Sequence, residues 1–192
     1  MEIGVLALQG DFEEHVSTLQ RIGVKTREVR LPEHLKGIQG LIIPGGESTT
    51  IGKLATDFGL IEPLIKFGVL HAIWGTCAGA IFISRDASRQ QPLLGLMDIH
   101  VDRNAFGRQI DSFEIDLEVP CLKQVDIKDI PFHAIFIRAP IISSVYGRSK
   151  VLASLPDGRI VAACQERLLA TSFHPELTGD DRFHRYFVEM AK

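Results

Sequence analysis

The sequence predicts a three-layer α/β/α fold with a central, mostly parallel mixed sheet and antiparallel strands in its C-terminal half. Strand-like and helix-like segments alternate through the first half of the 192-residue chain, which is typical of a parallel sheet covered by helices on both faces. From Gly95 onward, strand-like segments follow one another through short turns, and this favours antiparallel pairs. No repeat, linker or low-complexity tract divides the sequence, so we expect a single domain over residues 1–192.

The first three predicted strands are short apolar runs. Residues 3–8, 24–31 and 41–43 predict buried strands. A helix is expected between the first two, because apolar residues recur there at helical spacing: Phe12, Val16, Leu19 and Ile22. The third strand ends at Pro44-Gly45-Gly46, and a helix over residues 47–58 should follow, capped by one of three hydroxyl residues: Ser48, Thr49 or Thr50.

The next strand and helix flank a cysteine. Residues 69–74 predict a strand and residues 78–84 a helix, and Gly75-Thr76-Cys77-Ala78-Gly79 joins them. Gly-x-Cys-x-Gly between a strand and a helix has the pattern of a nucleophile elbow, whose tight turn requires small neighbours. Backbone N–H groups at the helix start would lower the pKa of the Cys77 thiol and stabilise a developing oxyanion. The alternative is a small buried cysteine with a packing role.

Strand-like segments and short turns dominate the second half, which ends in a helix. Proline and glycine in Pro156-Asp157-Gly158 predict one hairpin, and residues 165–167 predict another. The strands are expected at residues 112–118, 134–137, 160–164 and 168–173, and the closing helix at residues 180–191.

A histidine follows the last predicted strand, in His174-Pro175-Glu176. Proline restricts its own φ and keeps the preceding residue out of the helical region, so we expect this segment to be extended. Side chains two residues apart in an extended chain lie on one side, which lets the Glu176 carboxylate orient the His174 ring. With Cys77, these residues would form a nucleophile, base and orienting group. A structural or solvated histidine is the alternative, and the other histidines (15, 34, 71, 100, 133 and 184) lack a comparable neighbour in sequence.

Composition excludes several classes of protein. The net charge of −3 gives no electrostatic reason to expect nucleic acid or a membrane surface as the main partner. Cys77, Cys121 and Cys164 are odd in number and widely spaced, so neither a disulfide framework nor a zinc site is expected. We find no targeting segment and no apolar stretch long enough to span a bilayer, and a reducing cytoplasm fits best.

Two loops have both a structural and a functional interpretation. Residues 44–48 could form an ordinary turn before a helix, or a turn whose backbone N–H groups approach a substrate oxygen; they lack the lysine of a phosphate-binding loop. The segment from Arg103 to Gln109 could be a solvated loop or could bind a carboxylate through guanidinium groups. Because ligands bind at the carboxyl ends of parallel strands, we expect the turns at 44–48 and 75–79 to share one crevice.

Taken together, residues 44–48, 75–79 and 173–176 resemble the three signature sites of class I (triad) glutamine amidotransferases. Within that group, further segments resemble the glutaminase subunits of pyridoxal 5′-phosphate synthases: residues 7–12 with Glu14-His15, residues 103–109 and residues 136–140. The resemblance spans nearly the whole chain apart from residues 121–129, and it implies a flavodoxin-like fold.

This resemblance implies a role for each site residue. Cys77 would attack the side-chain amide of L-glutamine to form a γ-glutamyl thioester, His174 would move the proton, and Glu176 would orient His174. The backbone N–H groups of Gly46 and Ala78 would form the oxyanion hole. Substrate would be held by six residues: Gly46, Glu47, Ser48, Arg103, Ile137 and Arg138. The ammonia would pass to a separate synthase subunit that builds pyridoxal 5′-phosphate from sugar phosphates, and this chain would need neither metal nor cofactor.

Three alternatives remain open on the sequence. The chain could be the glutaminase of another synthase, such as imidazole glycerol phosphate synthase, although residues 7–10 and 103–109 argue against this. It could be a cysteine hydrolase or peptidase that cleaves another substrate. It could be a binding or regulatory subunit without activity, which Cys77, His174 and Glu176 make improbable.

Overall fold

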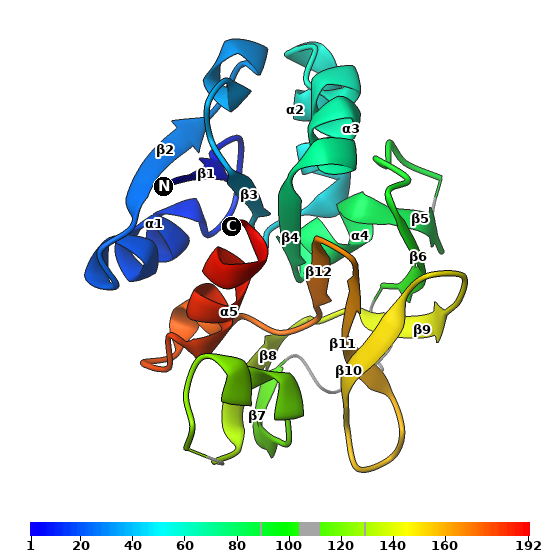
Figure 1. Ribbon diagram of the computed structural model, residues 1–192. Helices are drawn as coiled ribbons and strands as arrows, with labels where there is room; N and C mark the ends of the chain where they lie inside the picture. Colours follow the sequence, from blue (N-terminus) through cyan, green and yellow to red (C-terminus); the bar gives the residue numbers. More distant parts are fainter. Residues whose placement is uncertain (89, 104–111, 129) are drawn as a thin grey trace.

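A ten-stranded sheet forms the centre of the protein in the computed structural model, which describes residues 1–88, 90–103, 112–128 and 130–192 (Figure 1). The strand order is β2-β1-β3-β4-β12-β11-β9-β6-β5, and β10 pairs with β11. The first five strands in this order are parallel. They are β1 (Glu2–Leu6), β2 (Lys25–Val29), β3 (Gly40–Ile43), β4 (Ala72–Thr76) and β12 (Leu168–Thr171).

The remainder of the sheet is mostly antiparallel, as expected for the C-terminal half. The predicted hairpins are confirmed, since β10 pairs with β11 and β11 pairs with β12. These strands are β5 (Ser84–Ala87), β6 (Met97–Asp102), β9 (Ile141–Val145), β10 (Lys150–Ser154) and β11 (Ile160–Gln165). Two further strands, β7 (Ser112–Leu117) and β8 (Phe132–Ile137), form a separate two-stranded sheet.

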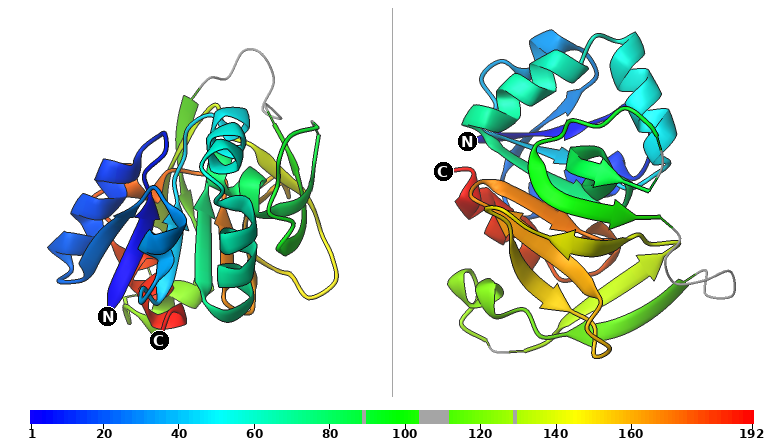
Figure 2. Two further views of the ribbon diagram at one scale, coloured as in Figure 1. Left: turned by 90° about the horizontal axis from the view of Figure 1, so that it is seen from above. Right: turned by 90° about the vertical axis from the view of Figure 1, so that its right-hand side faces the viewer.

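Helices cover both faces of the sheet, and this confirms the three-layer architecture (Figure 2). Strand residues alternate between two apolar clusters: Ile73 of β4 packs on one side and Trp74 on the other. α1 (Phe12–Arg21) and α5 (Arg182–Met190) lie on the Trp74 side. The Ile73 side carries α2 (Ser48–Asp57), α3 (Ile61–Leu70) and α4 (Ala78–Ile83).

Short 3₁₀ turns complete the structure: η1 (Pro32–Leu35), η2 (Pro120–Gln124) and η3 (Pro175–Leu177). Among the described residues, no helix combines the length and the apolar character that crossing a membrane requires.

The strand predicted over residues 69–74 is wrong at its start. Val69 and Leu70 are the last residues of α3, where their side chains are 74% and 68% exposed, and β4 begins only at Ala72. An apolar run by itself does not distinguish a strand from a helix end. The predicted cap of α2 also differs, because Glu47 rather than a hydroxyl residue accepts the hydrogen bond from the Thr50 N–H.

Candidate active site

Cys77 lies in a strained turn between β4 and α4. Its φ of 47° and ψ of −106° are unusual for a residue with a side chain, and such strain is typical of functional turns. The turn needs its flanking glycines, since a Cβ at Gly75 would overlap the backbone of Gly79, and one at Gly79 would overlap the Ile43 carbonyl of β3. Ala78 is the first residue of α4, so its N–H has no acceptor within the helix. The elbow predicted from the sequence is confirmed as a local structure.

His174 and Glu176 meet as expected, although the backbone between them is not extended. Pro175 begins η3, which is possible because a proline at the first position of a helical turn lacks only an N–H that would be unpaired there. His174 Nδ1 lies 2.7 Å from Glu176 Oε1, and both residues are buried. The expected contact therefore forms within a 3₁₀ turn.

Asp11 is a second acid beside His174. Its Oδ2 lies 3.4 Å from His174 Nδ1, farther than Glu176 Oε1, so the single hydrogen on Nδ1 is directed to Glu176. Burial alone would lower the pKa of His174, but hydrogen bonds with Asp11, Cys77 and Glu176 raise it to about 12. The hydrogen bond with His174 in turn lowers the pKa of Asp11. These hydrogen bonds make the His174 ring, which faces the Cys77 sulfur, a stronger base than an ordinary histidine.

The turn after β3 brings backbone groups close to Cys77. Gly46 has a φ of +147°, a conformation that only glycine adopts readily. The N–H of Glu47 donates to Gln9 Oε1 at 2.8 Å, so the exit of β1 holds this turn in place. Gly46 and Cys77 line the same cavities, which confirms that the two glycine-rich turns share one crevice.

Glu47, Ser48 and Arg103 form a polar cluster beside the thiol. Arg103 Nη2 donates to Glu47 Oε1 at 2.7 Å, and its Nη1 is buried with no hydrogen-bond partner among the described residues. Burial would raise the pKa of Glu47, but hydrogen bonds from Thr49, Thr50 and Arg103 lower it to about 2. Ser48 Oγ donates to Gln91 Oε1 at 3.2 Å. Glu47 is therefore a carboxylate at neutral pH.

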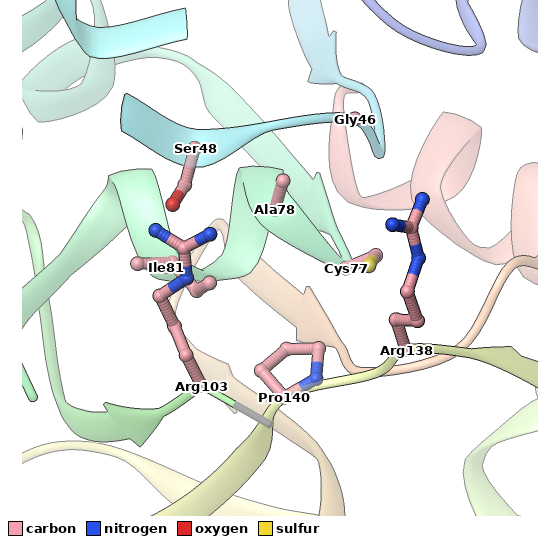
Figure 3. Close-up of a pocket in the computed structure, with 8 residues that line it drawn as sticks. All are labelled: Gly46, Ser48, Cys77, Ala78, Ile81, Arg103, Arg138 and Pro140. Carbon is pink, nitrogen blue, oxygen red and sulfur yellow. The ribbon is translucent and has the colours of Figure 1, made fainter. Parts of the chain in front are cut away.

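Two cavities meet at Gly46, Cys77 and Arg138. One has a volume of about 210 Å³. Ser48 and Arg103 are among the residues that line it, as Figure 3 shows. The other, about 350 Å³, is lined by seven further residues: Gln9, Gly10, Asp11, Glu47, Ile137, His174 and Leu177. All six residues expected to bind substrate line one cavity or the other. Residues 104–109 of the loop predicted to bind a carboxylate lie outside the described part of the chain.

Several lining or supporting residues were missed by the sequence analysis: Gln9, Asp11, Gln91, Pro140 and Leu177. Gln9 and Asp11 had a usable signal, because they follow a buried strand whose carboxyl end points to the expected crevice. Gln91 had none, since its place depends on how the loop before β6 packs on α2, where Pro92 touches Gly52.

Asp11, His174 and Glu176 also have the residue types of a metal site. Within the part of the chain that the structure describes, they are the one group of three whose ligand atoms lie close together. An imidazole that is protonated and donates to Glu176 has no lone pair on Nδ1 for a metal ion. The trio therefore does not suit a cation.

Comparison with known proteins gives consistent matches. The SNO glutamine amidotransferase family matches residues 5–192. Pyridoxal 5′-phosphate synthase subunit PdxT of Herpetosiphon aurantiacus is 57% identical over 195 residues, which cover 99% of this chain and 100% of the relative. The subunit of the same name from Pelotomaculum thermopropionicum is 54% identical over 193 residues, covering 100% of this chain and 95% of the relative.

Solved structures show the same fold. A crystal structure of a glutamine amidotransferase has a TM-score of 0.91 at 49% identity, with 98% of each chain covered. A structure of PurLQS from Thermotoga maritima has a TM-score of 0.74 at 15% identity, covering 100% of this chain and 98% of the matched one. The second match is a likeness of fold alone.

Proposed function

The chain belongs to the SNO glutamine amidotransferase family, and we propose that it is the glutaminase subunit of a pyridoxal 5′-phosphate synthase. It hydrolyses L-glutamine to L-glutamate and supplies the ammonia to a separate synthase subunit, with which it forms a hetero-oligomer. The observation that carries the chemistry is the convergence of a strained, buried Cys77 with His174 and its partner Glu176 at one cavity. The proposal assigns residues 1–192 to one glutaminase domain in a reducing cytoplasm.

Cys77 Sγ is the nucleophile in this proposal. His174 takes the thiol proton as Sγ attacks the side-chain amide carbon of glutamine, and it gives this proton to the departing nitrogen as the C–N bond breaks, so that ammonia leaves. Water then hydrolyses the γ-glutamyl thioester and restores the thiol. Glu176, 2.7 Å from His174 Nδ1, keeps the ring oriented and stabilises its charge.

The oxyanion hole consists of the backbone N–H groups of Gly46 and Ala78. The position of Ala78 at the start of α4 supports this role, because its N–H has no acceptor within the helix and Ala78 lines the cavity beside Cys77. Gly46 contributes from the opposite turn, which lines both cavities. One such donor is worth about 10²–10³ in rate.

Charged groups select the amino-acid end of glutamine. Arg103 Nη1, which is buried without a hydrogen-bond partner among the described residues, suits the α-carboxylate. The Glu47 carboxylate and the Ser48 hydroxyl suit the α-ammonium. Ile137 and Arg138 close the other side, where Arg138 adopts a φ of 44°. The pocket thereby takes a free amino acid, and this argues against a peptidase.

The destination of the ammonia is tested with isotope-labelled glutamine. Glutamine labelled with ¹⁵N at the amide should transfer its label to pyridoxal 5′-phosphate when the chain, sugar phosphates and a synthase subunit are combined. Asparagine, which is one methylene shorter, is the matched control and should transfer none. Glutamate release without labelled pyridoxal 5′-phosphate would leave a glutaminase but contradict this destination.

A further inference from the structure

Two fully buried histidines lie directly behind Glu176. His15 of α1 and His184 of α5 are both 0% exposed, and His15 Nδ1 lies 2.9 Å from His184 Nε2. The other nitrogen of His15, Nε2, lies 3.3 Å from Glu176 Oε2 and 3.2 Å from Thr76 Oγ1. No sequence pattern indicates this neighbourhood, because the three elements involved are far apart in the chain.

The contacts determine which nitrogens carry hydrogens. A bare Nε2 on His15 would place a lone pair 3.3 Å from a carboxylate oxygen, so this nitrogen carries the hydrogen and faces both Glu176 and Thr76. His15 Nδ1 then accepts, and His184 Nε2 must donate to it. His184 Nδ1 is left as an acceptor, and it is the ring nitrogen that is buried without a partner among the described residues.

Both rings are neutral in this arrangement. Burial lowers the pKa of His15 well below its usual range, and the charges of His184 and His174 lower it further. Burial likewise lowers the pKa of His184 to about 3. The Trp74 ring encloses the pair from the sheet, with its centroid 5.6 Å from His15 and 5.0 Å from His184. A neutral donor supports a carboxylate without removing its charge.

We propose that His15, held in one tautomer by His184, is a positioning residue that orients the Glu176 carboxylate and keeps it ionised for His174. The inference rests on the proposed glutaminase function. Glu176 is buried, and burial raises its pKa, so each donor to its oxygens favours the charged form. His174 supplies a donor to Oε1. Oε2 is buried with no aligned hydrogen bond among the described residues, and His15 Nε2, 3.3 Å away, is the nitrogen that faces it.

Any change in the pH dependence of the rate has to be explained by the titratable groups that surround Glu176. His174 and Asp11 lie on its solvent side, and His15 with His184 behind it lies on the α1 and α5 side. The neighbouring strand β8 contributes His133, which is exposed and bound to its own acids, Asp116 and Glu114. Removing the His15 donor raises the pKa of Glu176, so the acid limb of the rate profile should move to higher pH.

The test compares three substitutions at one position in the complex with a synthase subunit. His15→Leu should lower kcat for glutamine about tenfold or more, the scale of a hydrogen bond to a charged group, with little change in KM. Its acid limb should move to higher pH. In His15→Gln the amide reaches about as far as Nε2 and should restore most of kcat, whereas the shorter amide of His15→Asn reaches only the place of Nδ1 and should not.

A spectroscopic measurement on the wild-type chain tests which ring nitrogens carry hydrogens, and it does not depend on whether the His15 variants fold. Imidazole ¹⁵N shifts of the full chain should show His15 and His184 neutral, with hydrogen on Nε2, from pH 5 to pH 8. A protonated His15, or hydrogen on its Nδ1, would overturn the inference. The inference would also be overturned if His15→Leu kept the kcat and the acid limb of the pH–rate profile of the wild-type chain. The same holds if His15→Leu had a lowered Tm while the acid limb of its pH–rate profile did not move. If the wild-type complex releases no glutamate, the proposed function fails, and the ¹⁵N shifts still decide the tautomer.

Discussion

Glu47 links the start of a helix to the substrate cavity through the two oxygens of one carboxylate. Oε2 accepts the N–H of Thr50 at 2.8 Å and caps α2, while Oε1 accepts from Arg103 Nη2 at 2.7 Å. The cap fixes the carboxylate, and the carboxylate fixes the guanidinium, whose other nitrogen is buried and unpaired among the described residues. Single side chains thus set the charge pattern that a zwitterionic amino acid would meet.

Arg103→Met should raise the KM for glutamine about tenfold or more and leave kcat nearly unchanged, because the guanidinium would bind the α-carboxylate away from the reacting amide. The measurement is steady-state glutamate release in the complex. Arg148→Met is the matched control, since Arg148 forms an exposed pair with Glu166 and lines neither cavity. An equal effect of both substitutions would contradict the assignment.

Glu47→Gln should lower the free energy of unfolding at neutral pH. The pKa of Glu47 is lowered in the folded state, so its stabilising contribution is present above the unfolded pKa of about 4.5 and is lost as the pH falls toward 2. The side chain is 43% exposed, so solvent screening limits this contribution to about 1 kcal/mol or less. Urea unfolding at pH 7, 5 and 3.5 measures the difference in unfolding free energy between the wild-type chain and Glu47→Gln, and this difference should become smaller as the pH falls. A difference that stays constant with pH would exclude the charge effect.

The elbow is an element whose conformation depends on close backbone packing. β4, the Cys77 turn and α4 fit together because Gly75 contacts Gly79, and Gly79 lies against β3. This packing presents Cys77 at the carboxyl end of β4 and places Ala78, the first residue of α4, at the cavity wall. The strain at Cys77 is maintained by its neighbours.

Gly79→Ala should reduce stability by about 1–3 kcal/mol and abolish glutamate release, because the added Cβ overlaps the Ile43 carbonyl and forces α4 away from β3. Thermal unfolding and glutamine turnover measure both effects. Gly179→Ala is the control: its Cβ meets nothing within 4 Å, and we expect a change within about 0.5 kcal/mol. Normal turnover in Gly79→Ala would show that the elbow does not require this contact.

Local patterns in the sequence predicted the elements that depend on local chemistry. The Cys77 elbow and the two hairpins are confirmed, since glycine positions and short turns determine them. α3 was missed because apolar residues at its exposed end continue into β4, and the path of His174-Pro175-Glu176 was wrong because proline also fits a helical turn. The contact of His15 with Glu176 depends on tertiary packing alone and had no signal in the sequence.

The whole molecule brings the site together at one edge of the parallel sheet. β1, β3, β4 and β12 are adjacent, and the segments that follow them carry the polar groups of the crevice. One cavity is therefore lined by residues that lie up to 165 positions apart in the sequence: Gln9, Gly46, Cys77 and His174. Arg103, which follows β6, and Arg138, which follows β8 of the two-stranded sheet, also line the crevice.

Docking of the synthase subunit should raise glutamine turnover by this chain. Gly46 has a positive φ, and glycine changes conformation more readily than other residues, so docking can favour the conformation of this turn that catalysis requires. Glutamate release by the chain alone, with an equal amount of unrelated protein, and with the synthase subunit measures the effect. Equal rates in all three would contradict this dependence.

Replacing the nucleophile tests the central claim most directly. In the complex with the synthase subunit, supplied with sugar phosphates, the wild-type chain should convert glutamine to glutamate and yield pyridoxal 5′-phosphate. Cys77→Ala should release no glutamate while still binding the synthase subunit, and added ammonium salt should restore pyridoxal 5′-phosphate formation. Continued glutamate release by purified Cys77→Ala would contradict the assignment of Cys77 as the nucleophile.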